Sequence, residues 1–318
     1  MIHALRAFGS GLRTVLLAPL LLIVITTVTA ASAIPFGLIL DSQLRTALAN
    51  RQPVYLGTAE IDAEWWMEFR AHAEGLAATF TPAIIGFAAP LGNVSATLDG
   101  STRPLVLAGP VVLSLLVWSW LWGGLFARFA AGRRIGPRAF WAAAWLHARP
   151  FAVISLVAAV VQLVLYFTVH AVLFGPVYGW LATAAGSERA AFAWRVLLYA
   201  IFAMCLAVVS LMADYARISA VVTGRRGVRE AMVAAAGFLR RHVTSALVLY
   251  LLAGLLFVAL LVMYGVAEVY GGTRLGGWRS ILIGQGYIVA RLAIRLTLAA
   301  GGVRLFLRLQ RPASPGVS

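Results

Sequence analysis

Six long apolar runs constrain the fold of this chain more than any other feature of its sequence. A helix that crosses a bilayer needs about 20 mostly apolar residues, and its backbone polar groups must be satisfied within the segment. The runs therefore predict an all-α fold, a polytopic bundle of six transmembrane helices that forms one integral membrane domain over residues 1–318. The six runs are Val15–Leu40, Leu105–Phe126, Phe151–Phe174, Val196–Ala213, Thr244–Val266 and Ile281–Val303.

The composition agrees with a membrane protein and limits the kind of partner. Apolar residues make up 62% of the chain and charged residues 12%, whereas soluble domains are about half apolar and a quarter charged. All 26 basic residues are arginine, and the net charge is +15. Because these arginines flank the apolar runs, we interpret the charge as a signal of topology and lipid contact, not of nucleic-acid binding. The arginine, alanine and glycine usage indicates a bacterial protein, so we expect a bacterial inner membrane.

The charges between the runs predict the orientation. Residues 41–103 carry seven of the eleven acids and four arginines, while the connectors 127–150 and 214–243 carry five and six arginines. The positive-inside rule then places residues 41–103 outside, as an extracytoplasmic loop, and both basic connectors and both termini in the cytoplasm. Shorter outer loops are expected at Gly175–Ala190 and Ala267–Ser280.

Two parts of the N-terminal third need a separate interpretation. Arg6 and Arg13 precede an apolar core and an Ala-Ser-Ala sequence at residues 31–33, which is the pattern of a cleavable signal peptide. The apolar stretch continues to Leu40, which favours an uncleaved helix. In the outer loop we expect a helix within Glu60–Phe80. Phe80–Leu91 is too short to span and predicts an interfacial or re-entrant segment.

The two basic connectors resemble each other. Ala131–Phe151 and Thr223–Val243 match without gaps at eight of 21 positions, which predicts a parallel repeat of two helical hairpins, residues 105–174 and 196–266. In the second copy the apolar residues from Val228 to Leu239 recur at helical spacing. We therefore expect short amphipathic helices that lie along the inner headgroups.

Five connector arginines are candidate contacts for anionic lipid headgroups. An arginine near an anionic surface contributes about 1 kcal/mol to binding. The alternative is that these side chains only set the orientation of the spans. The five are Arg133, Arg134, Arg225, Arg226 and Arg229.

Polar residues within the spans form a second candidate site. Arg291 and Arg295 are four residues apart in the sixth run, Gln285 precedes them, and Asp214 closes the fourth run. An arginine at the bilayer centre costs roughly 2.5–3.5 kcal/mol, so such residues usually face a bundle interior or a wet cavity. Arg295 can instead extend to the inner headgroups. We expect Arg291 and Gln285 to line a polar interior region, with a snorkelling Arg291 or a shifted helix boundary as the alternatives. Asp214 should contact Arg217 and lie within reach of Arg295.

Catalytic and cofactor motifs are absent from the sequence. There is no P-loop, no HExxH and no Gly-x-Ser-x-Gly, and the single Cys205 cannot form a thiolate metal site. The predicted function is a non-enzymatic scaffold, accessory or lipid-interacting component that needs no cofactor and has membrane lipids, mainly anionic, as partners. The alternative is a transporter or permease subunit with a polar path near Arg291 and Gln285.

Three segments resemble a family of uncharacterised bacterial six-span membrane proteins. They are Glu64–Gly100 in the outer loop, Asp214–Gly227 (DYARISAVVTGRRG) and Gly284–Leu292 (GQGYIVARL). The resemblance extends over most of the chain and implies six spans, but it brings no activity or catalytic residue. An acidic pair precedes the two arginines of the second connector in the family pattern, whereas Thr223 and Gly224 stand there in this chain. This departure puts an acid-dependent role of that connector in doubt.

Overall fold

The computed structural model describes residues 2–48, 63–80, 88–101, 105–225, 227–268, 270 and 277–310. Within these ranges the regular structure is entirely helical, and six helices are long and apolar enough to cross a membrane. The all-α prediction with six spans is confirmed. The α-helices are α1 (Ile2–Leu16), α2 (Pro19–Leu48), α3 (Ala63–His72), α4 (Ala88–Leu98), α5 (Ala108–Ala131), α6 (Pro137–Leu165), α7 (Tyr178–Ala184), α8 (Glu188–Thr223), α9 (Val228–Ala267) and α11 (Gly277–Gln310).

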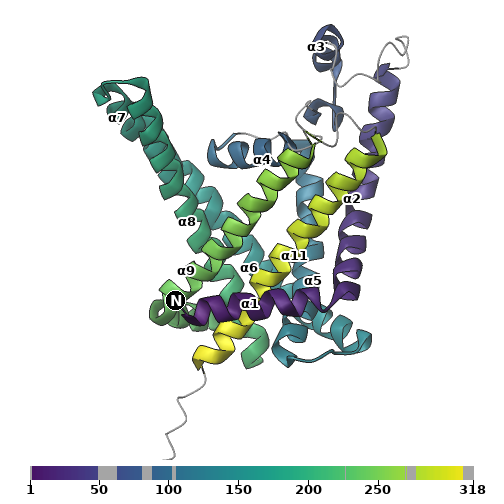
Figure 1. Cartoon of the computed structure of the whole chain (residues 1–318), viewed down its shortest axis with the longest axis vertical. Coiled ribbons are helices and arrows are strands. Elements are labelled where there is room, and N and C mark those ends of the chain that lie inside the picture. The colour runs from purple at the N-terminus through teal and green to yellow at the C-terminus, as the bar shows by residue number, and fades with distance from the viewer. Residues whose placement is uncertain are drawn as a thin grey trace, which may run out of the picture.

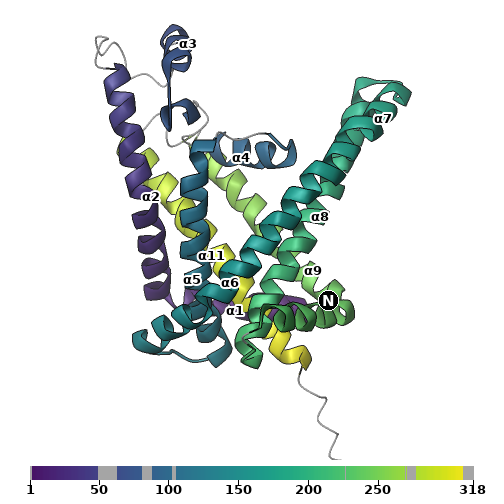
Figure 2. The same cartoon turned by 180° about the vertical axis from the view of Figure 1, so that it is seen from behind.

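The elements divide between two ends of the molecule (Figures 1 and 2). The first end carries α1, the short turns that follow α5 and α8, and the last residues of α11; we name it the connector end. The opposite end carries α3, α4 and α7, and we name it the loop end. All segments predicted to be cytoplasmic therefore lie together, and so do the described parts of the predicted outer loops.

The hydrophobic core lies in the half of the bundle nearer the connector end. Buried residues of α5 run from Trp118 to Phe129, and most of those of α8 lie between Leu211 and Ala220. The pairs α5 and α6, α8 and α9, and α9 and α11 pack together there. Towards the loop end, an arm formed by α6, α7 and α8 leans away from the other long helices (Figures 1 and 2). The bundle is thus closed at one end and splayed at the other.

The N-terminal helix α1 lies crosswise at the connector end (Figure 1). Its buried residues are Ala4, Ala7, Gly11 and Val15, which occupy one helical face. This face packs against α11. The sequence prediction began its first span at Val15 and missed α1. The Ala-Ser-Ala sequence of residues 31–33 lies inside α2, so the signal-peptide alternative would divide a continuous helix.

The two connectors share their local structure. Gly132 and Gly224, which are aligned positions, both have φ of +68° and end α5 and α8 in the left-handed conformation that favours glycine. The next helix starts at Pro137 in the first copy and at Val228 in the second. Superposition of the two whole hairpins stays a prediction.

The connector helices are longer than the sequence analysis expected. The prediction of a separate short helix before the third span is wrong, because α6 runs from Pro137 to Leu165 without a break despite Pro150. In α9 the helix is kinked at His242 (φ −133°, ψ 24°), the position aligned with Pro150. Only in the second connector, therefore, does a kink separate a first helical segment from the span that follows it.

Two outer-loop expectations also need correction. The loop expected at Gly175–Ala190 is helical up to Ala184, because Gly175 and Pro176 lie in a π-helical turn, η5 (Leu173–Val177), which follows the similar turn η4 (Tyr166–His170). Proline has no backbone N–H to donate within a helix, and a π turn is a local widening in which the helix continues past it. In the long loop, α3 lies within the expected helical region. Residues 81–87 of the expected interfacial segment lie outside the described part, and α4 begins directly after them and lies crosswise (Figure 1).

Candidate functional site

Five long helices, α5, α6, α8, α9 and α11, surround a cavity of about 410 Å³. Its wall combines apolar side chains such as Leu115, Trp122 and Leu298 with an unusual number of polar ones. Such a mixture of apolar surface and a few convergent polar groups is typical of ligand sites. The polar and charged residues of this wall include Ser155, Gln162, Ser210, Asp214, Arg217, Tyr250 and Arg295.

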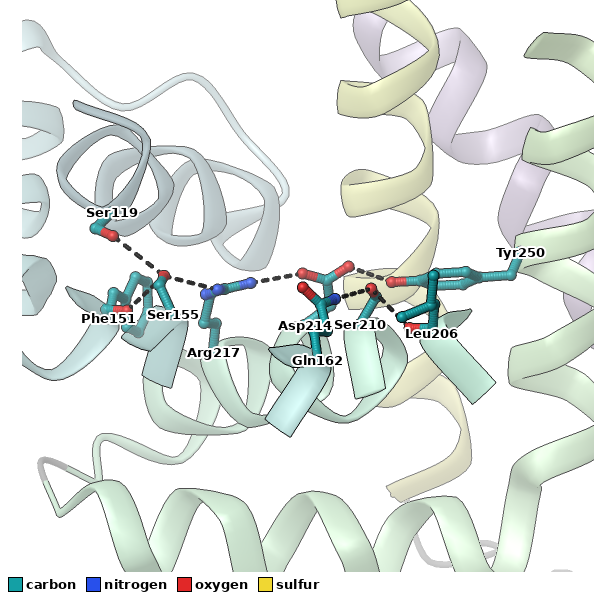
Figure 3. A network of polar contacts seen from close by, with 9 residues as sticks. All are labelled: Ser119, Phe151, Ser155, Gln162, Leu206, Ser210, Asp214, Arg217 and Tyr250. Carbon is teal, nitrogen blue, oxygen red and sulfur yellow. Dashed lines mark hydrogen bonds and ion pairs between the residues drawn. The ribbon is translucent and has the colours of Figure 1, made fainter. Parts of the chain in front are cut away.

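An ion pair on α8 forms the centre of the polar wall (Figure 3). Arg217 Nη1 lies 2.7 Å from Asp214 Oδ1, and the exposed fractions of the two side chains are 11% and 32%. The hydroxyl of Tyr250 on α9 donates a hydrogen bond to the other carboxylate oxygen of Asp214. The predicted contact between Asp214 and Arg217 is confirmed, and both oxygens of Asp214 are engaged by protein groups.

The ion pair extends into a hydrogen-bond network across α5 and α6 (Figure 3). Arg217 Nη2 donates to Ser155 Oγ at 2.9 Å, and Ser155 Oγ donates to the carbonyl oxygen of Phe151 at 2.8 Å. Ser119 Oγ lies 3.2 Å from Ser155 Oγ. A buried charge is costly unless it is paired and hydrogen-bonded. The network therefore engages both Nη atoms of Arg217, while its buried Nε has no hydrogen-bond partner among the described residues, and it links four helices to one another.

Arg295 is the second guanidinium on the cavity wall, and its surroundings differ from those of Arg217. Its Cζ lies 3.8 Å from the ring centroid of Trp118 and 5.2 Å from that of Trp122. Among the residues that the structure describes, no acid forms an ion pair with it. Stacking on an indole uses the face of the guanidinium and leaves its N–H groups free to donate in the plane. Arg295 therefore adds a second positive charge to the wall, in place of the expected extension to the inner headgroups. It forms no ion pair with a described acid there, although the charge of Asp214 on the same wall attracts it.

The predicted intramembrane residues divide into two groups. Asp214 and Arg295 both line the cavity. Gln285 and Arg291 are exposed and are not among its lining residues, and the expected interior position of Arg291 stays a prediction. Arg291 lies one helical turn closer to the loop end than Arg295, about 6 Å along the axis. Arg295 is exposed as well, so the two arginines are distinguished by the cavity lining, which contains Arg295, and not by burial.

The direction of each helix shows which part of the wall faces the loop end. On α6, α8, α9 and α11 the lining residues nearest that end are Gln162, Ser210, Tyr250 and Arg295, which we name the polar rim. Gln162 Nε2 donates to Ser210 Oγ across the rim at 3.3 Å. At the opposite end the wall is formed by residues such as Phe126 and Ile218, whose exposed fractions are 1% and 2%. The cavity is thus polar at its mouth and closed at its base.

Several site residues were not predicted from the sequence. Gln162 and Tyr250 interrupt apolar runs, and a polar side chain within a predicted span is a sequence signal of an interior site. Ser155 and Ser119 give a weaker signal, because serine in a span usually bonds to its own backbone. Trp118 and Trp122 give none, since aromatic residues in an apolar run look like ordinary packing residues.

The connector arginines form a separate candidate surface. Arg133, Arg134, Arg225 and Arg229 are all exposed at the connector end, as contact with headgroups requires; Arg226 lies outside the described residues. In the same segment Ala235 and Leu239 are buried, which matches the apolar face expected there. The first part of α9 is therefore an amphipathic helix with its arginines outward.

Comparison of the chain with protein-family models, curated proteins and solved structures finds no match. No family is therefore identified, and the resemblance to six-span membrane proteins extends only to the number of spans that the structure shows. In the described part of the chain, no group of three or more histidine, cysteine or acidic side chains is placed to hold a metal ion.

Proposed function

We propose that this multi-pass membrane protein binds an anionic group in its central cavity and serves as a non-enzymatic, lipid-interacting component of a bacterial inner membrane. The observation that carries the proposal is Arg295, a guanidinium within a membrane-spanning helix that lines a cavity and forms no ion pair with any acid that the structure describes. An arginine at such depth is costly unless it finds a counter-charge or water. A phosphate or carboxylate group at the polar rim would supply that counter-charge.

The other polar groups support an anion, not a cation. Among the residues that the structure describes, Asp214 is the only acid that lines the cavity, and its two oxygens already accept bonds from Arg217 and Tyr250. The wall therefore carries two guanidinium groups and one neutralised carboxylate. Gln162 and Ser210 supply neutral hydrogen-bonding groups beside Arg295. Apolar residues such as Leu115 and Leu298 fit the glycerol or acyl part of a lipid.

We propose no catalytic step for this cavity. In the described part of the chain, its lining contains no histidine and no cysteine, and its serines at 155 and 210 donate to backbone carbonyls instead of to a base. A nucleophile needs an adjacent base or a lowered pKa to react. The arrangement supports binding alone.

A transporter or permease subunit is the second candidate. Arg291 favours it, because this exposed arginine lies one turn outward of Arg295 and extends the positive charge towards the loop end. The buried base of the cavity, with Phe126 and Ile218, favours a binding site over a continuous path in this conformation.

Replacement of Arg295 by methionine should weaken anion binding at least tenfold, which corresponds to about 1.4 kcal/mol. Hydrogen bonds to charged groups contribute about 1.5–3 kcal/mol. Calorimetric titration of the purified protein in detergent would measure the affinity, with a short-chain phosphatidylglycerol in one series and inorganic phosphate in a second. Binding of the phosphatidylglycerol alone assigns a lipid headgroup, and binding of both assigns a free anion.

The matched control for this titration is Arg308→Met, which removes the same charge from an exposed position near the end of α11. The control should bind as the unchanged protein does. Equal losses in both variants, or no binding by the unchanged protein, would contradict the proposed site.

The orientation forms a further part of the proposal. We place the connector end in the cytoplasm because its exposed arginines follow the positive-inside rule, and there they contact anionic headgroups. In a Cys205→Ala background, a membrane-impermeant thiol reagent applied to intact cells should label Met67→Cys on α3 and spare Val233→Cys on α9. Both native side chains are 65% exposed. Labelling of position 233 without position 67 would reverse the orientation.

A further inference from the structure

The crosswise helix α4 is held by its C-terminal end on the arm. Tyr166 and His170 are the first and last residues of the π turn η4. The hydroxyl of Tyr166 donates to the carbonyl oxygen of Thr97, and Nε2 of His170 lies 3.0 Å from the carbonyl oxygen of Leu98. The helix packs chiefly on α8. Two carbonyls at the end of α4, which have no partner within the helix, are thus satisfied by the arm.

Asp99 forms the second half of this attachment. The hydroxyl of Tyr199 on α8 donates to Asp99 Oδ1, and Ser95 Oγ donates to Oδ2 at 2.7 Å. Arg195 Nη2 lies 3.9 Å from the same carboxylate, and its Nε donates to the hydroxyl of Tyr199. The hydrogen bonds from Tyr199 and Ser95 lower the pKa of Asp99 below its usual range, so the carboxylate is ionised at neutral pH and accepts both bonds.

The turn after Asp99 is shaped for the same contact. Gly100 has φ of +63°, and a Cβ at this position would lie 3.0 Å from Cε1 of His170. Only glycine accepts both the backbone conformation and the ring without strain. We use the name latch for Thr97–Gly100 together with Tyr166, His170, Arg195 and Tyr199.

The latch lies directly outward of the polar rim. Tyr166, the first residue of η4, follows Gln162 of α6 by four residues, about 6 Å towards the loop end. Tyr199 precedes Ser210 by eleven residues on α8, about 16 Å in the same direction. Figures 1 and 2 show α4 extending from the arm across to the other long helices at this end. The helix that the latch holds therefore lies outward of the polar rim, at the end of the molecule to which the rim is nearest.

We propose that α4 is a strap that limits access to the cavity from the loop end and that release of the latch opens this access. The ligand named above rests on the proposed function, whereas the strap does not depend on which ligand enters. The latch contacts are polar and partly exposed, with exposed fractions of 49% for Arg195 and 35% for Asp99. Exposed ion pairs contribute little to stability, and elements that move are drawn from the regions of low local stability.

A reporter cysteine in the cavity tests the strap without any ligand. In a Cys205→Ala background, Ser210→Cys is labelled with a water-soluble thiol reagent in lipid nanodiscs. Tyr199→Phe, which removes the hydroxyl that holds Asp99, should raise the labelling rate about tenfold. An unchanged rate, or no labelling of Ser210→Cys in either background, would overturn the proposal.

Two controls separate opening of the strap from general loosening. Tyr178→Phe keeps a ring beside Arg195, where Tyr178 makes a cation–π contact at 5.7 Å, and should leave the rate unchanged. A reporter at Val233→Cys, far from the cavity, should react equally with and without Tyr199→Phe. A rise at both reporters would show unfolding and overturn the strap. Because no anion is present, the result is independent of the Arg295 titration, and either proposal can fail alone.

Discussion

Replacement of Arg217 by methionine should lower the free energy of unfolding by about 2–4 kcal/mol. The substitution removes the cation that lies 2.7 Å from Asp214 and leaves the carboxylate in the wall of a cavity within the spans. Breaking a fully buried ion pair costs about 3–5 kcal/mol. The expected loss is smaller here because Asp214 is 32% exposed and keeps the hydrogen bond from Tyr250. Reversible unfolding in detergent, followed by circular dichroism, would measure it.

The second substitution Asp214→Asn should restore most of that stability, because it removes the unpaired charge and keeps a group that can bond to Tyr250. Arg229→Met serves as the control, since Arg229 is exposed and its loss should change the stability by less than about 0.5 kcal/mol. If Arg217→Met and Arg229→Met unfold alike, the network around Asp214 contributes nothing measurable, and its role in fixing four helices is wrong.

At the crossing of α1 and α11, Gly11→Ala should destabilise the protein by about 2–3 kcal/mol or detach α1. A Cβ on Gly11 would lie 2.6 Å from the carbonyl oxygen of Thr297 and 2.8 Å from the backbone nitrogen of Gly301. Both are backbone atoms of a long helix and cannot rotate away, so the two helices must separate. Overpacking of this kind typically costs about 1–3 kcal/mol.

Gly9 supplies a control two residues earlier on the same helix. A Cβ on Gly9 has no neighbour within 4 Å, so Gly9→Ala should be neutral or stabilising by about 0.5–1 kcal/mol, the usual gain from alanine in a helix. The same unfolding measurement would rank the two variants. Equal stability of Gly9→Ala and Gly11→Ala would show that α1 does not approach α11 as closely as the structure places it.

The spans could be predicted from the sequence because a run of about 20 apolar residues has few alternatives to a membrane helix. Their ends could not. The helix α8 continues ten residues past Ala213, through Arg217 to Thr223, because those residues are buried by neighbouring helices that a single-sequence pattern does not show. The helix α1 was missed for a related reason. Its contact face contains Ala4, Ala7 and Gly11, small residues that allow close packing and produce little apolar signal.

The candidate site could be predicted in part. Asp214 and Arg295 were found because a charge in a membrane span is rare and usually functional. Both Arg291 and Arg295 are exposed, and of the two Arg295 lines the cavity, which depth along a single helix does not predict. Trp118 and Trp122 hold Arg295 through a contact between α5 and α11, and a contact between distant segments leaves no pattern in one sequence.

The part of the arm formed by α6 and α7 is too long for an upright position in a membrane. Residues Pro137–Ala184 form one helical unit of 48 residues, about 72 Å in length, and the hydrocarbon core measures about 30 Å. Beyond Trp145 and Leu146 near the connector end, its exposed large apolar residues extend from Val153 to Trp180, which corresponds to about 40 Å along the axis. Such a mismatch is relieved by tilting, here by roughly 40°, or by a local change in bilayer thickness. Because the arm carries Gln162 and the latch, a thinner bilayer would increase the tilt and move one wall of the mouth, so that lipid chain length becomes a physical control on the width of the cavity entrance.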